Sequence, residues 1–328
     1  MRRRALLISA VGLLVCARPA RGQPRRSPAR LAILSPDSSS SSESLPTFLR
    51  ALRELGYVDG ENLNIEFRFA ENQLDRLPEL ASELVAWKPD VIYTYTSGGA
   101  RAAAIATRRI PIVVGAANET VLLALVGNLA RPVGNVTGLA LDALGQYEKC
   151  LELLKELSPR ALLVGVLLNP DNPAWADYPA ILNLAADRLG LVLVKATSRG
   201  QTDIDDTLMG LDGEKLDALL LTNDSVFFND DRARARIIEF ARDRHLPSAT
   251  TNLVYPRRGG LLALGTDQAF LRRRAAEFVH RIIEGGRPGD LPVERPTKYQ
   301  LSVNLLAAKA IGVTIPSSLL ARADEVIE

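Results

Sequence analysis

The chain has 328 residues, with 40 Lys and Arg against 38 Asp and Glu, two cysteines and two histidines. Its formal net charge of +2 becomes −3 when the first 22 residues are set aside, because that stretch holds five arginines and no acid. The rest has neither the charge excess nor the clustered basic and aromatic residues that predict a nucleic-acid partner. His245 and His280 have no partners at metal-ligand spacing, so we expect no metal site. Only Cys150 lies beyond residue 22, which excludes a disulfide there.

The N-terminus has the pattern of an export signal. Three arginines (2–4) precede an apolar run (5–15), and a small-x-small triplet (20–22) stands before Gln23. The run is too short to remain as a membrane anchor, so we expect cleavage near Gln23 and a periplasmic protein. The arginines also fit a twin-arginine signal weakly, which leaves the export route open. A lipidated Cys16 is the alternative, but the valine before it is bulkier than lipid-attachment sites usually tolerate.

After the signal, apolar strand-like runs alternate with helix-like segments, which is typical of parallel sheets built from βαβ units. In the first half we predict strands at 31–34, 63–69, 90–96 and 111–115 and helices at 44–55, 74–87 and 100–109. The second half repeats this order, with strands at 162–168, 191–196, 217–222 and 247–251 and helices at 174–189, 202–212 and 230–244. The halves share landmarks at similar offsets: Gly56 and Gly190, Asp90 and Asp217, Pro111 and Pro247. We therefore predict an α/β fold with two doubly wound parallel-sheet lobes joined by a hinge.

Two such lobes place the carboxyl ends of their strands at a common crevice, which is where open α/β sheets bind ligands. The segments at those ends are rich in hydroxyls, amides, glycines and carboxylates. One of them (94–99) runs from a strand into an alanine-rich helix, and its hydroxyls and free N–H groups suit an anion at the positive helix end. We predict that it receives a carboxylate. The predicted ligand-binding residues are Ser35, Thr96, Ser97, Gly98, Ala116, Ala117, Asn118, Thr137, Asn169, Asn172, Thr222, Asp224 and Thr251.

Several side chains near the predicted crevice have two interpretations. Trp175 and Tyr178 either stack on an aromatic ligand or pack the start of a helix, and packing is favoured. The pair 227–228, two phenylalanines, has the same alternatives, again with packing favoured. Asp224 either pairs with a ligand ammonium or caps the helix that follows. The three arginines at 272–274 are expected on a solvated helix face.

Five segments resemble the substrate-binding proteins of ABC importers, in particular the subfamily that includes the tryptophan-type TrpX binding proteins. They are "LRELGYVDGENLNIEFRF" and its continuation (52–85), "NVTGL" (135–139), "LELLKELSP" (151–159), "LLNPDNP" (167–173) and the tail that begins "LPVERPTKYQ" (291–328). The resemblance implies a type I periplasmic-binding-protein fold with three crossover segments. One lobe would comprise 30–138 plus about 267–290, and the other 139–266 plus about 291–328. It also implies a small-molecule ligand, an ABC permease in the inner membrane as partner, and a monomer.

Other activities lack their sequence motifs. We find no G-x-G-x-x-G opening a helix, no P-loop and no G-x-S-x-G elbow, so we predict no cofactor and no catalysis. The predicted function is capture of a small carboxylate-bearing solute, an amino acid or related metabolite, by hinge closure. A subunit that presents a solute to a sensor or chemoreceptor would have the same sequence pattern. An exported two-lobed enzyme is the less favoured alternative.

Overall fold

The first of two β-sheets in the computed structural model is entirely parallel. The structure describes residues 27–38, 45–172, 178–228, 230–296 and 299–328. The strand order is β2-β1-β3-β4-β5, with bounds β1 (Ala29–Ser35), β2 (Leu63–Phe69), β3 (Val91–Thr94), β4 (Ile112–Asn118) and β5 (Val136–Leu141). Neighbouring strands are parallel throughout. From β1 the chain winds outward in both directions, which is the doubly wound arrangement predicted. We call this sheet and its helices the first lobe.

The second sheet repeats this plan and extends it. Its order is β12-β11-β10-β9-β8-β6-β7, with bounds β6 (Leu163–Leu168), β7 (Val192–Thr197), β8 (Ala218–Leu221), β9 (Ser248–Thr250), β10 (Leu262–Thr266), β11 (Tyr299–Asn304) and β12 (Glu325–Ile327). The five strands from β7 to β10 match the order of the first sheet, which confirms the predicted repeat. The antiparallel pairing of β11 with β10 was not predicted. It arises because the chain visits the first lobe between these strands and returns at the end where β10 finishes, so that Tyr299 at the start of β11 pairs with Thr266 at the end of β10. We call this sheet and its helices the second lobe.

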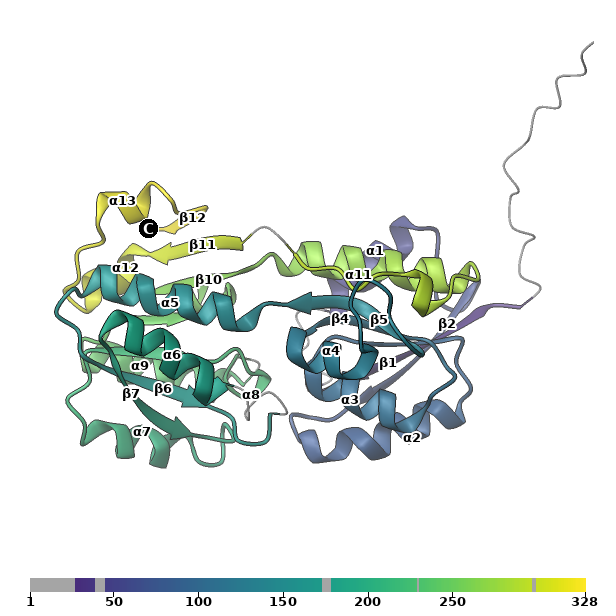
Figure 1. The fold of residues 1–328 in the computed structure, drawn as a ribbon, viewed down its shortest axis with the longest axis horizontal. Helices are drawn as coiled ribbons and strands as arrows, with labels where there is room; N and C mark the ends of the chain where they lie inside the picture. The colour runs from purple at the N-terminus through teal and green to yellow at the C-terminus, as the bar shows by residue number, and fades with distance from the viewer. Residues whose placement is uncertain (1–26, 39–44, 173–177, 229, 297–298) are drawn as a thin grey trace, which may run out of the picture.

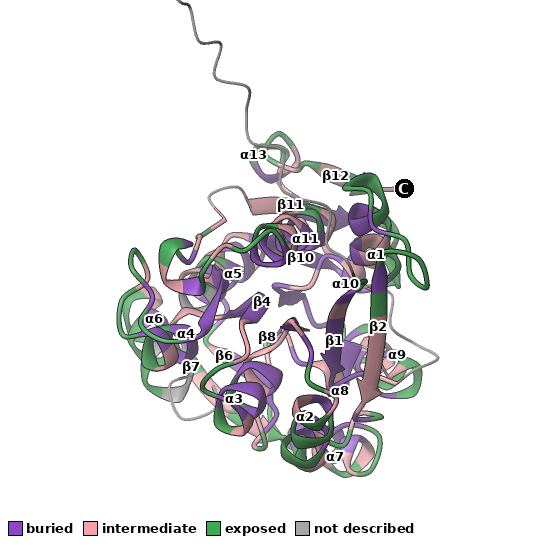
Figure 2. Ribbon diagram, turned by 90° about the vertical axis from the view of Figure 1, so that its right-hand side faces the viewer, coloured by how far each residue is buried: buried purple, intermediate pink, exposed green. Residues whose placement is uncertain are grey.

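Helices cover both faces of each sheet, so the central strands are buried on both sides (Figure 2). In the first lobe one face carries α1 (Leu45–Glu54) and α11 (Gln268–Ile283), and the other carries α2 (Leu77–Ala86), α3 (Ser97–Ala106) and α4 (Glu119–Val126). In the second lobe one face carries α5 (Ala143–Leu157), α6 (Tyr178–Leu189), α12 (Leu305–Ala310) and α13 (Ser317–Leu320). The other carries α7 (Ile204–Asp212), α8 (Ser225–Phe228), α9 (Asp231–Asp243) and α10 (Val254–Arg257). Two 3₁₀ turns, η1 (Leu74–Arg76) and η2 (Pro288–Asp290), complete the described elements.

The landmarks shared by the two halves have matching roles. Gly56 and Gly190 follow α1 and α6 with φ of 91° and 63°, the left-handed region that favours glycine after a helix. Asp90, just before β3, accepts a hydrogen bond from the backbone N of Arg30 at 2.8 Å. Asp217, just before β8, accepts one from the N of Leu163 at 2.9 Å. Each carboxylate thus ties the start of one strand to its neighbour.

The lobes lie side by side and are joined by three crossing segments (Figure 1). The chain leaves the first sheet after Leu141 and enters α5, whose buried side chains belong to the second lobe. It returns from β10 into α11, which packs on the first lobe. The third crossing follows Glu294, whose backbone accepts from the N of Ala140 at 2.9 Å. Because all three crossings lie along one side, the opposite side of the molecule is where the lobes can separate.

Candidate ligand-binding site

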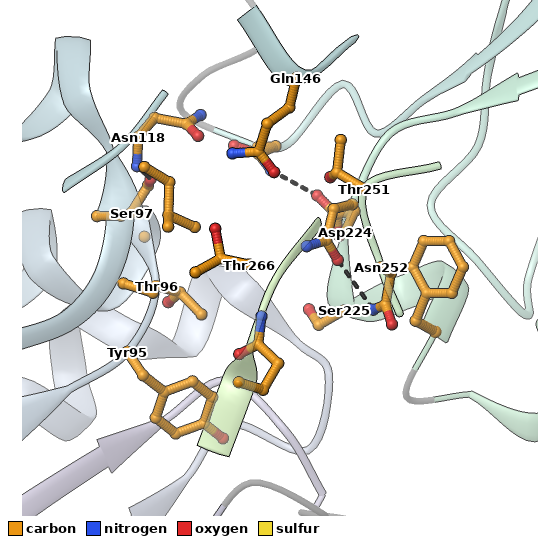
Figure 3. A pocket seen from close by; sticks show the side chains of 18 of the residues that line it. Tyr95, Thr96, Ser97, Asn118, Gln146, Asp224, Ser225, Thr251, Asn252 and Thr266 are labelled. Atoms are coloured by element: carbon orange, nitrogen blue, oxygen red, sulfur yellow. Dashed lines mark hydrogen bonds between the residues drawn. The ribbon is translucent and has the colours of Figure 1, made fainter. Parts of the chain in front are cut away.

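A cavity of about 290 Å³ lies between the lobes, at the carboxyl ends of both sheets. In the first lobe its walls come from the segments after β1 and β3 and from the end of β4, and in the second from the segments after β6, β8 and β9, with α5 and the start of α11 completing it. In each sheet the winding direction reverses between the first and third strands, so the loops after them diverge and leave space. Figure 3 shows side chains of the two lobes facing one another across this space. The volume lies just below the usual range for small-molecule pockets, about 300–1,000 Å³.

Most of the predicted residues line the cavity. They are Thr96, Ser97, Gly98, Ala116, Ala117, Asn118, Asn172, Asp224 and Thr251. Thr137 and Thr222 do not, because their buried hydroxyls donate into the protein. Thr137 bonds the carbonyl of Leu291 at 2.6 Å, and Thr222 bonds that of Leu167 at 2.9 Å. We therefore assign these two threonines to the walls rather than to ligand contact.

Ser35 and Asn169 lie one layer behind the cavity. The Ser35 hydroxyl is 2.7 Å from that of Tyr95, which lines the cavity. Asn169 donates its side-chain N–H to the Oδ1 of Asp224 at 3.0 Å. Both residues therefore position a lining side chain, and neither lines the cavity itself.

The loop between β3 and α3 has a tightly determined geometry. The helix begins at Ser97, three residues earlier than predicted, because Thr96 caps it by accepting from the N of Gly99 at 3.2 Å. The Ser97 hydroxyl accepts from the N of Asn118 at 3.0 Å, which ties the loop to the end of β4. A Cβ on Gly99 would lie 2.0 Å from the Oγ1 of Thr94, so only glycine fits there without displacement. The first turn of α3, with N–H groups that lack intrahelical partners, is thereby held at the cavity wall.

Tyr95 connects this loop with the segment after β1. Its hydroxyl donates to the Oδ2 of Asp37, and the Asp37 N donates to the Ser35 hydroxyl at 3.1 Å. Asp37 is 2 % exposed and lines the cavity. A buried carboxylate therefore stands in the first-lobe wall beside an aromatic ring.

Arg272 corrects the expectation of a solvated arginine face on α11. Arg273 is exposed as expected, but Arg272 is 5 % exposed and lines the cavity. Its guanidinium carbon lies 4.6 Å from the centroid of the Tyr95 ring, and its Nη2 donates to the Oε1 of Gln268 at 3.2 Å. Arg274 is half-buried and pairs with Glu294 at 2.5 Å. The three arginines do not form one solvated face because α11 packs along the first lobe, which buries side chains at intervals of three or four residues.

Asp224 organises the second-lobe wall. Its carboxylate accepts from the side chains of Asn169 at 3.0 Å and Asn172 at 2.6 Å. It also accepts from the N of Val226 at 3.2 Å, so it has the predicted role at the start of α8. Burial raises the pKa of Asp224, and these hydrogen bonds oppose the rise. The same carboxylate therefore caps a helix and lies at the cavity.

Amide and aromatic side chains complete the second-lobe wall. Asn252 donates to the Oδ1 of Asn223 at 3.0 Å, and the N of Asn223 donates to the Tyr147 hydroxyl at 2.6 Å. Of the two adjacent phenylalanines, Phe227 is fully buried in the core, as favoured, whereas Phe228 both packs and lines the cavity. Trp175, the side chain of Tyr178 and the proposed signal at 1–22 lie outside the described residues.

The lining residues that were not predicted fall into two groups. Those near strand ends, such as Tyr95 and Asn252, lie in segments that the sequence already indicated, but they were not among the residues selected. Those on α5 and α11, which include Gln146 and Arg272, have no local signal in the sequence. They reach the cavity only because the chain crosses between the lobes.

Within the described ranges, no three His, Cys, Asp or Glu side chains are grouped closely enough to hold a metal ion. Among the same residues, no helix is both long and apolar enough to cross a membrane.

Two doubly wound lobes with a cavity of polar, charged and aromatic side chains between them form the arrangement expected of a protein that encloses a small molecule. A family model of ABC transporter substrate-binding proteins matches residues 31–327, and the chain belongs to that family. It is thus a substrate-binding protein. Members of this family are binding proteins and not enzymes, and they normally act outside the cytoplasm. The recognised resemblance and the type I periplasmic-binding fold are confirmed.

Three relatives illustrate the similarity. A tyrosine-binding protein of Clostridioides difficile strain R20291 is 29% identical over 266 residues, which cover 81% of this chain and 75% of the relative. A crystal structure of a conserved domain protein from Vibrio cholerae has a TM-score of 0.83 at 29% identity, covering 91% of this chain and 99% of that one. A domain from Streptococcus pneumoniae in complex with L-Trp has a TM-score of 0.81 at 23% identity, covering 90% of this chain and 100% of that one.

Proposed function

We propose that the protein is the solute receptor of an ABC importer for an aromatic α-amino acid of the tyrosine or tryptophan class. The observation that carries the proposal is the composition of the cavity wall. Three aromatic side chains, Tyr95, Tyr147 and Phe228, share it with the buried charges of Arg272 and Asp37. The ring of an aromatic amino acid would pack against the aromatic side chains, and its carboxylate and ammonium would complement the charges of Arg272 and Asp37. The similarity to a tyrosine-binding protein supports this ligand class.

The proposed orientation places the ligand carboxylate at the first turn of α3. There Thr96 and Ser97 contribute hydroxyls, and the helix N-terminus contributes N–H groups. The ammonium would lie at Asp37. Asp224 is the less suitable partner because burial raises its pKa, which disfavours its charged form. The ring would occupy the space between the aromatic side chains of the two lobes.

Capture would proceed by closure of the second lobe over a ligand held on the first. We place the hinge at the three crossings, near 141–143, 266–268 and after 294. The closed form would be recognised by an inner-membrane permease, and the protein would act as a monomer that releases its ligand chemically unchanged. Residues 1–22 would direct export and be removed near Gln23. N-terminal sequencing of the periplasmic protein tests the last point, and a lipidated Cys16 would contradict it.

The ligand class is tested by thermal shift over a panel of L-tyrosine, L-tryptophan, L-phenylalanine, L-leucine, L-glutamate, succinate and myo-inositol. A ligand at about a hundred times its Kd stabilises the folded protein by ~2.7 kcal/mol. We expect that effect for the aromatic amino acids and little for the sugar alcohol. A panel in which L-leucine or succinate binds more tightly than every aromatic member would refute the assignment. Recovery of the ligand unchanged after incubation tests the absence of catalysis.

A further inference from the structure

Buried polar atoms without partners gather near the cavity, mostly in the first lobe. Among the described residues, six buried side-chain N or O atoms lack a hydrogen-bond partner. Five of them belong to Tyr93, Thr94, Thr266 and Arg272. Thr266 and Arg272 line the cavity, and the other two end the strand that leads into Tyr95. Because an unsatisfied buried group is costly, such a concentration indicates that something else completes the site when it is occupied.

Arg272 is the charged member of this group. Among the described residues its Nε and Nη1 are buried without a hydrogen-bond partner, and its Nη2 donates to the neutral side chain of Gln268. It forms no ion pair with any described carboxylate, although its neighbours Arg274 and Glu294 pair with each other. Burial raises the pKa of the nearby Tyr93 hydroxyl, and the charge on Arg272 opposes that rise. The positive charge therefore acts on its buried surroundings, and no described carboxylate lies close enough to it to form an ion pair.

We propose that Arg272 is the specificity-determining residue for a carboxylate-bearing ligand. This inference rests on the proposed function, which places a carboxylate in the same first-lobe wall. A guanidinium that is removed from water gains strongly from an anion several ångströms away, since the interior screens charge less than water does. Arg272 lies over the Tyr95 ring, and α3 begins two residues after Tyr95, so both positive groups favour a negative ligand group at this wall. The guanidinium therefore discriminates between ligands with and without a carboxylate more strongly than the N-terminus of α3 would alone.

The alternative is that Arg272 is only structural and packs against the Tyr95 ring. The two roles differ in one measurable respect. A packing role affects all ligands of the same shape equally, whereas a charge role affects only ligands that bear a carboxylate. L-tyrosine and tyramine differ in that group alone, as do L-tryptophan and tryptamine.

The experiment measures Kd by titration calorimetry for these two pairs with the wild-type protein, Arg272→Gln, Arg272→Lys and the matched control Arg273→Gln. For Arg272→Gln we expect the affinity for the amino acids to fall roughly 10- to 100-fold and that for the amines to be unchanged or higher. Arg272→Lys retains the charge and should preserve most of the preference. Arg273→Gln alters an exposed arginine one position along the helix and should leave all four affinities near the wild-type values.

Equal losses for the amino acid and its amine would overturn the inference and leave Arg272 with a packing role. If Arg272→Gln does not fold, as judged by circular dichroism, Arg272→Lys decides, because loss of the carboxylate preference despite the retained charge also overturns it. If the wild-type protein binds none of the aromatic amino acids but binds L-leucine or L-glutamate, the proposed ligand class fails. Arg272 is then tested with that amino acid and its amine. If only myo-inositol binds, both proposals fail.

Discussion

Replacing Gly99 with alanine tests whether the loop between β3 and α3 is held as tightly as the structure indicates. An added Cβ would lie 2.0 Å from the Oγ1 of Thr94 and 3.2 Å from its Cβ. Thr94 is fully buried and β-branched, so its side chain has little freedom to turn its hydroxyl away. Overpacking of this kind costs typically about 1–3 kcal/mol. Alanine in a helix regains about 0.5–1 kcal/mol, so we expect a net loss of up to about 2.5 kcal/mol in the free energy of unfolding.

The matched control is Gly210→Ala in α7. An added Cβ there meets no atom within 4 Å, so the same substitution should stabilise the protein by about 0.5–1 kcal/mol. Urea unfolding measures both changes. The double variant Thr94→Ala, Gly99→Ala should recover part of the loss, because it removes the atoms that collide.

The loop prediction also has a functional readout. Displacement of the first turn of α3 should weaken L-tyrosine binding for Gly99→Ala and leave it unchanged for Gly210→Ala. If Gly99→Ala is as stabilising as Gly210→Ala, or shows no coupling to Thr94→Ala, the tight packing of this loop is wrong.

Three further predictions concern single side chains. Ser97→Ala removes a proposed hydrogen bond to a charged ligand group and should weaken L-tyrosine binding roughly 10- to 100-fold, as measured by calorimetry. The control Ser317→Ala, at an exposed position in α13, should have no effect. Equal affinities for the two variants would mean that the ligand carboxylate binds elsewhere in the cavity. Burial raises the folded-state pKa of Asp224, so the unfolded chain releases that proton at lower pH than the folded protein. The stability of the wild type relative to Asp224→Asn, measured by urea unfolding, should therefore fall as pH rises from about 4 through the raised pKa, by at most about 1.4 kcal/mol per pH unit. A relative stability that rises with pH would mean that the hydrogen bonds from the amides outweigh the effect of burial. Burial raises the pKa of Cys150 to about 12, so a thiol reagent at pH 8 should label it only after unfolding, and fast labelling of the folded protein would contradict its position in the core.

The sequence alone determined the lobes, because their elements are encoded locally. Continuous apolar strand runs alternate with helical segments, and Gly56 and Gly190 mark corresponding helix ends by a conformation that glycine adopts readily. The loop at 95–98 was identifiable because hydroxyls and glycines directly follow a buried strand. Strand ends of doubly wound sheets meet at one edge, so most of the residues predicted from those ends line the cavity.

The tertiary structure decided which of these residues face the ligand space and which distant elements join them. Thr137 and Thr222 stand at strand ends like their neighbours, yet their hydroxyls turn to backbone carbonyls, a choice that depends on packing across strands. Arg272 is one of three consecutive arginines with nothing local to distinguish it. It is buried at the cavity because α11 follows the second lobe in the chain but packs on the first. Local periodicity shows that a helix forms, whereas its partner and its buried face depend on contacts between residues far apart in the sequence.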